Sequence, residues 1–280
     1  MLPLPDGAFA PLAALLGLLV GSFLNVVIHR VPKMMEAQWA AQAAEFEGRE
    51  PERQAAYNLW TPASQCPSCA APLRAWHNIP VVSYLALRGR CANCAAPISA
   101  RYPAVEALTG ALSYWVAVHF GWGLAGAGGL ILVWFLIAVS FIDADTTLLP
   151  DSMTLPLLWM GLLLNLKGTF APLPEAVIGA CAGYLVLWLV YWAFKLVTGR
   201  EGMGYGDFKL LAALGAWLGW TMLLPIVLLS SLAGAVLGVG LLVLARRGRN
   251  VPIPFGPYLA IAGFITLLYG KQIVTGMGWR

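Results

Sequence analysis

Long apolar stretches alternate with short polar segments along most of this chain. Windows of about 20 apolar residues, the length of a membrane-spanning helix, predict eight spans. These lie near residues 9–29, 103–120, 124–142, 153–166, 175–197, 207–220, 222–245 and 253–270. The fourth and sixth windows are short, because prolines and polar residues blur their ends. The pattern predicts an all-α polytopic membrane protein.

One polar insertion, from about residue 31 to residue 102, interrupts this pattern. We expect a first transmembrane helix at 1–30, a loop domain at 31–102 and a seven-helix membrane core at 103–280. The first half of the insertion is rich in Ala, Glu and Gln, which predicts amphipathic helix interrupted near Gly48 and Pro51. Its second half carries four cysteines.

Composition supports a membrane protein, and the distribution of charge predicts its orientation in the membrane. Of the 280 residues, 60% are hydrophobic and 11% are charged, and the mean hydropathy of +0.75 excludes an ordinary soluble domain. If the N-terminus is outside, all but Lys167, Lys271 and Arg280 of the 17 Lys and Arg residues fall on the inner side. This bias predicts external termini and a cytoplasmic insertion, and the net charge of +4 then needs no nucleic-acid partner. Only Asp6 is charged before the first span, so we expect no removable signal peptide there.

Two CxxC pairs in the insertion form a specific local motif. Cys66 and Cys69 make the first pair, and Cys91 and Cys94 make the second. Their spacing is close to that of zinc ribbons, in which such knuckles bring four thiolates onto one tetrahedral metal. With no open coordination position, the metal is expected to be structural. Two disulfides are the alternative, but they require an oxidising compartment, and the charge bias places the insertion in the reducing cytoplasm.

Two carboxylates lie where apolar runs end or begin. Asp143 closes the run LILVWFLIAVSFI, and Asp207 opens the run FKLLAALGAWLGW directly after GMGYG. An acid at the end of a span is costly unless it faces a polar cavity or shares a proton, so it is a functional candidate. If both lie at one membrane face, they can share a proton, which leaves an acid beside a base as in aspartic proteases. Asp145 and Asp151 are placed in the connecting loop, as solvated acids or, for Asp151, as a helix N-cap.

The glycines before Asp207 have a separate interpretation. Gly202, Gly204 and Gly206 permit positive φ and close backbone approach, which would bring a substrate strand beside the carboxylate. They do not form a nucleotide-binding loop, because they lack the GxGxxG spacing and the lysine of a P-loop. Lys209 is on another helix face from Asp207 and is interpreted as an anchor at the lipid interface.

Other polar residues near the ends of the spans have either two possible roles or only a structural one. Glu106 is either functional or simply pairs with an arginine near the interface. Asn25, His29 and Arg30 mark the inner end of the first span, where we expect hydrogen bonds between helices. Cys181, alone in the fifth span, is expected to be a small buried apolar side chain.

Taken together, these segments resemble the bacterial type IV prepilin peptidases, which are GxGD-type intramembrane aspartyl proteases. The resemblance runs through nearly the whole chain and includes both CxxC pairs. The other matching segments are GSFLNVVIHRVP at 21–32, HNIPVVSYLALRGRC at 77–91, RYPAVE at 101–106, FIDADTTLLPD at 141–151 and GMGYGDFKLLAALGAWLG at 202–219.

The resemblance implies an enzyme of the bacterial inner membrane with Asp143 and Asp207 as its catalytic pair. Its substrates would be prepilins and pseudopilins with a short basic leader, cleaved at the cytoplasmic face after a Gly and usually before a Phe. The new N-terminus would then be methylated with S-adenosylmethionine as donor. The chain has no Rossmann glycine fingerprint, so the methyltransferase activity rests on the resemblance alone. The basic turn Arg88, Gly89 and Arg90 beside the second knuckle is the candidate contact for the donor.

Two other functional classes are compatible with intramembrane acids. A transporter or channel binds protons or cations near the bilayer midplane, but both acids here lie at span ends and the halves show no inverted repeat. A noncatalytic scaffold with a zinc ribbon gives no reason for Asp207 to follow three glycines. Proteolysis is therefore the preferred hypothesis, with a polytopic transporter or channel as the alternative.

Overall fold

The computed structural model describes residues 7–49, 56–244 and 254–278, and it divides into two compact units. The N-terminal unit comprises residues 1–118 and the C-terminal unit residues 119–280. The described residues form helices and loops, with two isolated β-bridges and no longer strand. This confirms the predicted all-α class.

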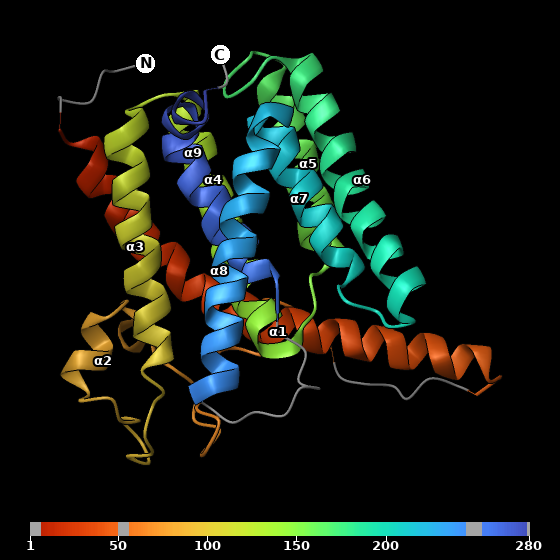
Figure 1. The fold of residues 1–280 in the computed structure, drawn as a ribbon. Coiled ribbons are helices and arrows are strands. Elements are labelled where there is room, and N and C mark those ends of the chain that lie inside the picture. The colour runs from red at the N-terminus through yellow and green to blue at the C-terminus, as the bar shows by residue number, and fades with distance from the viewer. Residues whose placement is uncertain (1–6, 50–55, 245–253, 279–280) are drawn as a thin grey trace. The chain divides into compact units, whose positions relative to one another are not determined.

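The N-terminal unit consists of one long helix, two short helical turns and most of another long helix (Figure 1). Close packing of α1 against α3 depends on glycine, because a Cβ at Gly21 would lie 2.8 Å from Glu106 Cα, and one at Gly17 would strike Ser113. Small residues four apart allow such approach between helices in lipid. The elements are α1 (Phe9–Phe46), η1 (Ala75–Asn78), α2 (Val82–Ala86) and α3 (Arg101–Phe120).

Helix α1 is longer than the sequence suggested. The predicted span ended at residue 29, but the helix continues through Pro32 to Phe46 and so includes the amphipathic segment expected beyond it. Pro32 removes only one backbone hydrogen-bond donor, and the helix continues past it. The next described residue with positive φ is Gly48, at +67°, and it lies just beyond the last turn, where the helix ends. The predicted interruption near Gly48 is therefore confirmed, whereas Pro51 lies outside the described residues.

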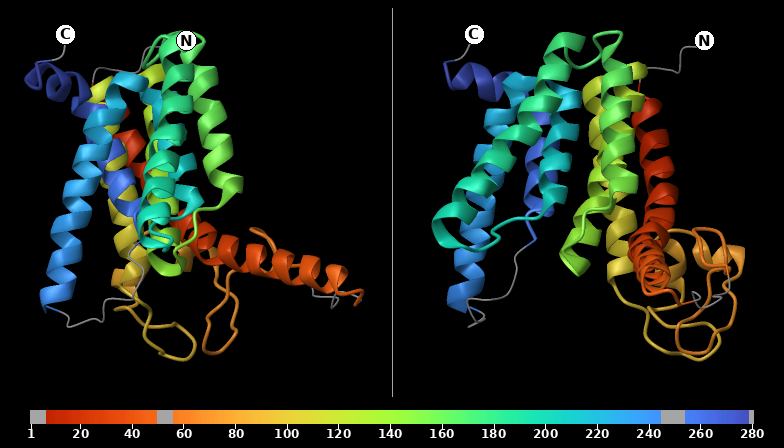
Figure 2. Two further views of the ribbon diagram at one scale, coloured as in Figure 1. Left: turned by 45° about the vertical axis from the view of Figure 1, so that its right-hand side comes forward. Right: turned by 90° about the vertical axis from the view of Figure 1, so that its right-hand side faces the viewer.

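The C-terminal unit contains six further α-helices and one short turn. In it, α7 packs against α5 and α6, while α9 packs against α4 and α8. Figures 1 and 2 both show α6 and α7 running beside each other. The elements are α4 (Leu124–Thr146), α5 (Asp151–Asn165), α6 (Leu173–Thr198), α7 (Tyr205–Leu218), η2 (Trp220–Met222), α8 (Leu223–Leu244) and α9 (Gly256–Gly276). Each span predicted in this unit therefore contains a helix, with ends shifted by at most six residues among those that the structure describes.

Helix α7 is the most buried helix of this unit and is held by contacts with α6 and with α5. Gly179 of α6 and Gly215 of α7 bring the two backbones into direct contact. On the other side, the Asn165 amide donates to the carbonyls of Ala216 and Trp217 at 2.9 and 2.8 Å. The indole of Trp217 donates in turn to the Leu157 carbonyl at 2.8 Å. Buried polar groups are thus satisfied, and these contacts fix the C-terminal end of α7.

Four described helices are long and apolar enough to cross a membrane: α1, α4, α6 and α9. Helices α5 and α7 have 15 and 14 residues, or about 22 and 21 Å at the helical rise, which is shorter than a bilayer core of about 30 Å. A membrane protein is therefore supported, while the number of eight spans stays a prediction. The expectation for Cys181 is wrong: it is exposed on α6, because lipid is as apolar as a protein core and no protein contact is required there.

Candidate active site and metal centre

A cavity of about 310 Å³ in the C-terminal unit is lined by both predicted acids. Asp143 comes from the last turn of α4, and Asp207 is the third residue of α7. The remaining lining residues come from the turn after α4, the loop before α7 and the start of α9. They are Thr147, Leu149, Glu201, Gly202, Met203, Gly204, Gly206, Pro254 and Phe255.

Asp143 is held by the first residue of α9. Its side chain is only 4% exposed, and its Oδ2 accepts a hydrogen bond of 2.8 Å from the backbone N–H of Gly256. The N-terminus of a helix carries partial positive charge and unpaired N–H groups, so it stabilises a carboxylate. A Cβ at Gly256 would lie 2.7 Å from the same oxygen. Gly256 therefore permits the bond by lacking a side chain.

Asp207 is equally buried but has a different environment. The residue is 6% exposed, and its Oδ1 has no hydrogen-bond partner among the described residues. Buried carboxyl oxygens rarely lack a hydrogen-bond partner. An unpaired one that lines a cavity is therefore a candidate to bind a substrate or a reacting water. Asp207 also lies in the first turn of α7, where the helix dipole favours negative charge.

The loop before α7 is fastened to the end of α6. Gly199 adopts φ +69° and ends that helix, and Lys195 Nζ donates to Glu201 Oε1 at 2.9 Å. The same ammonium group donates to the Tyr191 hydroxyl at 3.2 Å. The hydrogen bond and the charge of Lys195 hold the pKa of Glu201 below its usual value. Glu201 is thus an ionised side chain at the edge of the cavity.

The three glycines of GMGYG do not supply the positive φ that was expected of them, and the expected approach of a substrate strand stays a prediction. None of Gly202, Gly204 and Gly206 has positive φ, so backbone freedom is not their function. Gly206 is needed for packing, because a Cβ there would lie 2.5 Å from Leu149 Cβ. A Cβ at Gly202 would lie 2.9 Å from the ring of Phe194, whereas one at Gly204 would meet only Asp207 Oδ2, at 3.7 Å.

We therefore expect Gly206→Ala to destabilise the protein and Gly204→Ala to leave its stability unchanged. The first adds a methyl group against an immobile Cβ, and such overpacking costs about 1–3 kcal/mol. Thermal unfolding of both purified variants in one detergent measures the difference. Equal loss of stability in the two variants would contradict the packing role assigned to Gly206.

The four knuckle cysteines form one cluster in the N-terminal unit. The sulfurs of Cys66, Cys69, Cys91 and Cys94 all lie within 4.8 Å of one another, and none is in a disulfide. Cys66 Sγ and Cys94 Sγ are 3.9 Å apart. Zinc–sulfur bonds of about 2.3 Å in a tetrahedron place the sulfurs about 3.8 Å apart, so the donor set fits one zinc ion.

The two knuckles repeat the same backbone design. In the first, Ala70 has φ +56° and donates to the Cys66 carbonyl at 2.9 Å. In the second, Ala95 has φ +57° and donates to the Cys91 carbonyl at 3.0 Å. A short antiparallel bridge closes each turn. The bridges are Gln65 with Pro72 and Arg90 with Pro97.

The environment of the cluster already favours a thiolate at Cys69. The Asn93 amide, which donates to this sulfur at 3.5 Å, and then the backbone at Ala71 lower the pKa of the Cys69 thiol to about 6. The backbone N–H of Ala96 lowers the pKa of Cys94, but neighbours of Cys94, Cys69 first among them, raise it to about 11. Without a cation the cluster cannot carry four negative charges, and a divalent metal supplies the missing compensation.

Known protein families match both the segment that contains the cysteine cluster and the segment that contains the two buried acids. Residues 15–120 match the family model described as the bacterial peptidase A24 N-terminal domain, and residues 130–239 match the type IV leader peptidase family. The chain belongs to the type IV leader peptidase family. The first match contains the cysteine cluster, and the second contains Asp143 and Asp207.

Curated relatives cover almost the whole chain. A protein of Pseudomonas aeruginosa is 60% identical over 95% of this chain and 92% of its own length. Proteins of Stutzerimonas stutzeri and Aeromonas salmonicida are each 58% identical, over 95% and 94% of this chain and 92% and 91% of their own lengths. All three are named prepilin leader peptidase/N-methyltransferase. No solved structure matches the chain.

Two acids of the leader peptidase segment FIDADTTLLPD are placed differently from expectation. Asp145 lies within the last turn of α4 and is exposed, outside the lining of the cavity. Asp151 is the first residue of α5, whose N-cap is Pro150, so the N-cap prediction is wrong. Asp151 instead accepts hydrogen bonds from Lys209 at 2.6 and 2.7 Å. Lys209 is therefore an ion-pair partner between α5 and α7, because its position in the second turn of α7 faces the start of α5.

Polar residues of the N-terminal domain mostly hold its loop against the helices. Asn25 donates to the Tyr102 carbonyl at 3.1 Å, which is the predicted bond between helices. Arg30 instead donates to loop carbonyls, and His29 lies 3.1 Å from Lys33 in its own helix. Glu106 is buried and accepts a hydrogen bond of 2.8 Å from the backbone N–H of Val81. That bond fixes the start of α2 to α3.

Sequence reasoning missed two residues that shape the environment of the acids, Gly256, which binds Asp143, and Glu201, which lines the cavity. Gly256 supplies the donor to Asp143 although it lies 113 positions away in the chain. Its only local signal is the cluster Pro254, Phe255, Gly256 and Pro257 at the start of a helix. This cluster indicates a turn, but it does not show which side chain accepts the Gly256 N–H. Glu201 was not singled out because a single acid next to glycines is usually solvated.

Proposed function

We propose that this chain cleaves the leader peptides of prepilins and pseudopilins and then methylates the new N-terminal residue. The observation that carries the first activity is the burial of Asp143 and Asp207 in one cavity. Asp143 accepts the N–H of the first residue of α9, and Asp207 lies in the first turn of α7. The relatives named above, which match almost the whole chain, support both activities. The proposed location is the bacterial inner membrane, with the site open to the cytoplasm.

The hydrogen bonds support a division of roles between the acids. Asp143, which accepts the N–H of Gly256, is the ionised base, and Asp207, which has no donor on Oδ1, carries the shared proton. Asp143 takes a proton from water, whose oxygen bonds to the scissile carbonyl carbon, while Asp207 gives its proton to the carbonyl oxygen. As the tetrahedral intermediate collapses, the carbon–nitrogen bond breaks, Asp143 gives its proton to the leaving amine, and Asp207 recovers one from the hydroxyl.

The cysteine cluster is proposed to hold a structural zinc in a cytoplasmic loop domain at 31–102, beside a membrane core at 103–280. The cluster offers four sulfur donors and so leaves no coordination position for a substrate. When bound, zinc would cross-link the two knuckles. The peptidase step would use only the carboxyl groups of Asp143 and Asp207.

The methyl donor is proposed to be S-adenosylmethionine, which supplies a methyl group to the unprotonated N-terminal amine and leaves as S-adenosylhomocysteine. Incubating the purified full chain in detergent with a purified prepilin and this donor tests both activities at once. Mass spectrometry is expected to detect loss of the leader and gain of one methyl group. An intact prepilin that never loses its leader would contradict the proposal and favour the transporter hypothesis.

The turn at Arg88, Gly89 and Arg90 is proposed to matter for methylation more than for cleavage. Gly89 has φ +67°, and a Cβ there would lie 2.9 Å from the Tyr84 hydroxyl, so any side chain distorts the turn. We expect Gly89→Ala to lower methyl transfer by about tenfold or more while leader removal continues, because neither acid lies in this unit. Equal loss of both activities in a folded variant would remove the basis for two separate sites.

A further inference from the structure

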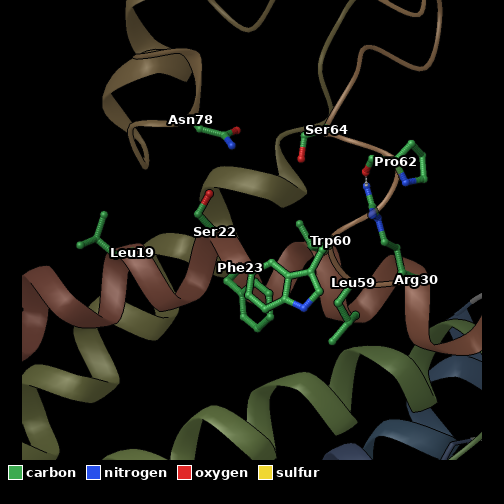
Figure 3. A pocket seen from close by; sticks show the side chains of 10 residues that line it. Leu19, Ser22, Phe23, Arg30, Leu59, Trp60, Pro62, Ser64 and Asn78 are labelled. Atoms are coloured by element: carbon green, nitrogen blue, oxygen red, sulfur yellow. Dashed lines mark hydrogen bonds between the residues drawn. The ribbon is translucent and has the colours of Figure 1, made fainter. Parts of the chain in front are cut away.

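A second cavity, of about 360 Å³, lies entirely within the N-terminal unit. Its volume is within the range of small-molecule sites, about 300–1,000 Å³. Helix α1 forms one wall, the segment from Leu59 to Ser64 forms another, and Asn78 of η1 closes the side (Figure 3). The cavity contains no residue of the carboxylate pair and no knuckle cysteine.

One wall of this cavity is a pair of stacked aromatic rings. The rings of Phe23 and Trp60 have centroids 5.8 Å apart and an interplanar angle of 26°. Trp60 is 80% exposed, although a large aromatic side chain on a loop is normally buried. Its indole therefore presents a flat face on which a planar heterocycle can stack.

The turn that presents Trp60 is fixed before any ligand binds. The Asn58 side-chain oxygen accepts hydrogen bonds of 2.8 Å from the backbone N–H groups of Trp60 and Thr61. Arg30 of α1 then donates to the carbonyls of Asn58 and Pro62 at 2.8 and 2.7 Å. Such a turn holds the indole in place at little entropic cost on binding.

Arg30 also supplies positive charge: its guanidinium lies over the Tyr57 ring, 5.6 Å from the ring centroid, and no described carboxylate neutralises it. The residue is only 8% exposed. Its two hydrogen bonds to carbonyls leave further N–H donors of the guanidinium unused. A buried cation without a counter-charge favours an anionic group in the same cavity.

The remaining polar side chains that line the cavity are uncharged. In Figure 3 the hydroxyl groups of Ser22 and Ser64 and the amide of Asn78 face the same space. Within the described part of the chain, the side chains of Ser64 and Asn78 form no hydrogen bond. The Ser22 side chain already hydrogen-bonds the Glu106 carboxyl. The side chains of Ser64 and Asn78 are therefore the groups that can bind a polyhydroxylated ring.

We propose that this cavity binds S-adenosylmethionine, with the adenine on Trp60, the ribose near Ser64 and Asn78, and the carboxylate toward Arg30. The proposal rests on the methyltransferase activity proposed above. It places the donor in the same unit as the turn at Arg88, Gly89 and Arg90, which does not line the cavity, so that turn would not contact the donor as the sequence suggested. An anionic phospholipid could also approach Arg30, but a lipid headgroup makes no use of a stacked indole or of uncharged hydrogen-bonding groups.

Binding of S-adenosylhomocysteine to the purified full chain tests the site without turnover. We expect Trp60→Ala to weaken binding by about tenfold or more, as loss of one base–aromatic stack does. Trp39→Ala is the matched control, because Trp39 is an exposed indole of the same unit outside the cavity. Prepilin cleavage is expected to be unchanged in both variants.

Photo-crosslinking of radiolabelled S-adenosylmethionine to the unmodified protein gives a second measurement that needs no variant. The label is expected on peptides containing Phe23 or Trp60. Wild-type affinity in Trp60→Ala, or label confined to other peptides, would overturn the site while leaving the methyltransferase proposal intact. Unchanged affinity together with loss of co-purified anionic phospholipid would identify a lipid site instead. Absence of both methyl transfer and binding in the wild type would refute the activity itself.

Discussion

Replacing either Asp143 or Asp207 by Asn is expected to abolish leader cleavage. Each change removes an acid–base group from the cavity, and losing such a group lowers rates by about 10²–10⁴-fold. The amide is nearly the same size as the carboxyl, so folding and prepilin binding should persist. Initial rates of leader removal by purified variants, with wild-type thermal unfolding as a check, measure the effect.

Two neighbouring acids provide matched controls for this experiment. Asp145→Asn changes an exposed side chain outside the cavity, and Asp151→Asn weakens an ion pair with Lys209 whose acid is 55% exposed. Exposed pairs contribute about 1 kcal/mol or less, so both variants should cleave nearly normally. Full activity in Asp143→Asn with complete loss in Asp145→Asn would transfer the first catalytic role to Asp145.

Loss of the metal is expected to unfold the region from residue 60 to residue 100. Metal ligation supplies about 10–16 kcal/mol of apparent folding free energy in small zinc domains, and this segment has few buried apolar side chains besides Cys66. Elemental analysis should find one zinc per chain in the wild type and none in Cys66→Ser. Hydrogen exchange in the 60–100 region should then become rapid.

Cys181→Ser is the control for that measurement, because Cys181 lies on α6 in the other unit. It should retain the zinc and the protection of the 60–100 region. A wild-type protein with no zinc and with its four knuckle cysteines in two disulfides would contradict both the metal site and the cytoplasmic location of the loop.

The sequence predicted the helices and the cysteine cluster because both are encoded locally. Apolar windows of the right length mark each helix, and a CxxC pair fixes its own turn, so the two knuckles have nearly identical hydrogen bonds. The acids were also singled out locally, by their positions at the ends of apolar runs. Placing Asp143 and Asp207 in one cavity, however, required the packing of α4, α7 and α9.

Features that depend on distant contacts could not be predicted. The N–H of Gly256 and the pairing of Asp151 with Lys209 join segments far apart in the chain. Gly206 was correctly marked as special, but its reason, the neighbouring Leu149, is visible only in the structure. The cavity at Trp60 was missed for the same reason, since Asn58 and Arg30 meet only after the loop folds back on α1.

The most direct test of two chemistries on separate residues uses Asp207→Asn with two substrates. One is an intact prepilin, and the other is the same pilin already lacking its leader, each supplied with S-adenosylmethionine and analysed by mass spectrometry. We predict that the variant leaves the prepilin uncut but methylates the pre-cleaved pilin at the wild-type rate. Removal of the leader by Asp207→Asn at the wild-type rate would contradict the proposed catalytic pair.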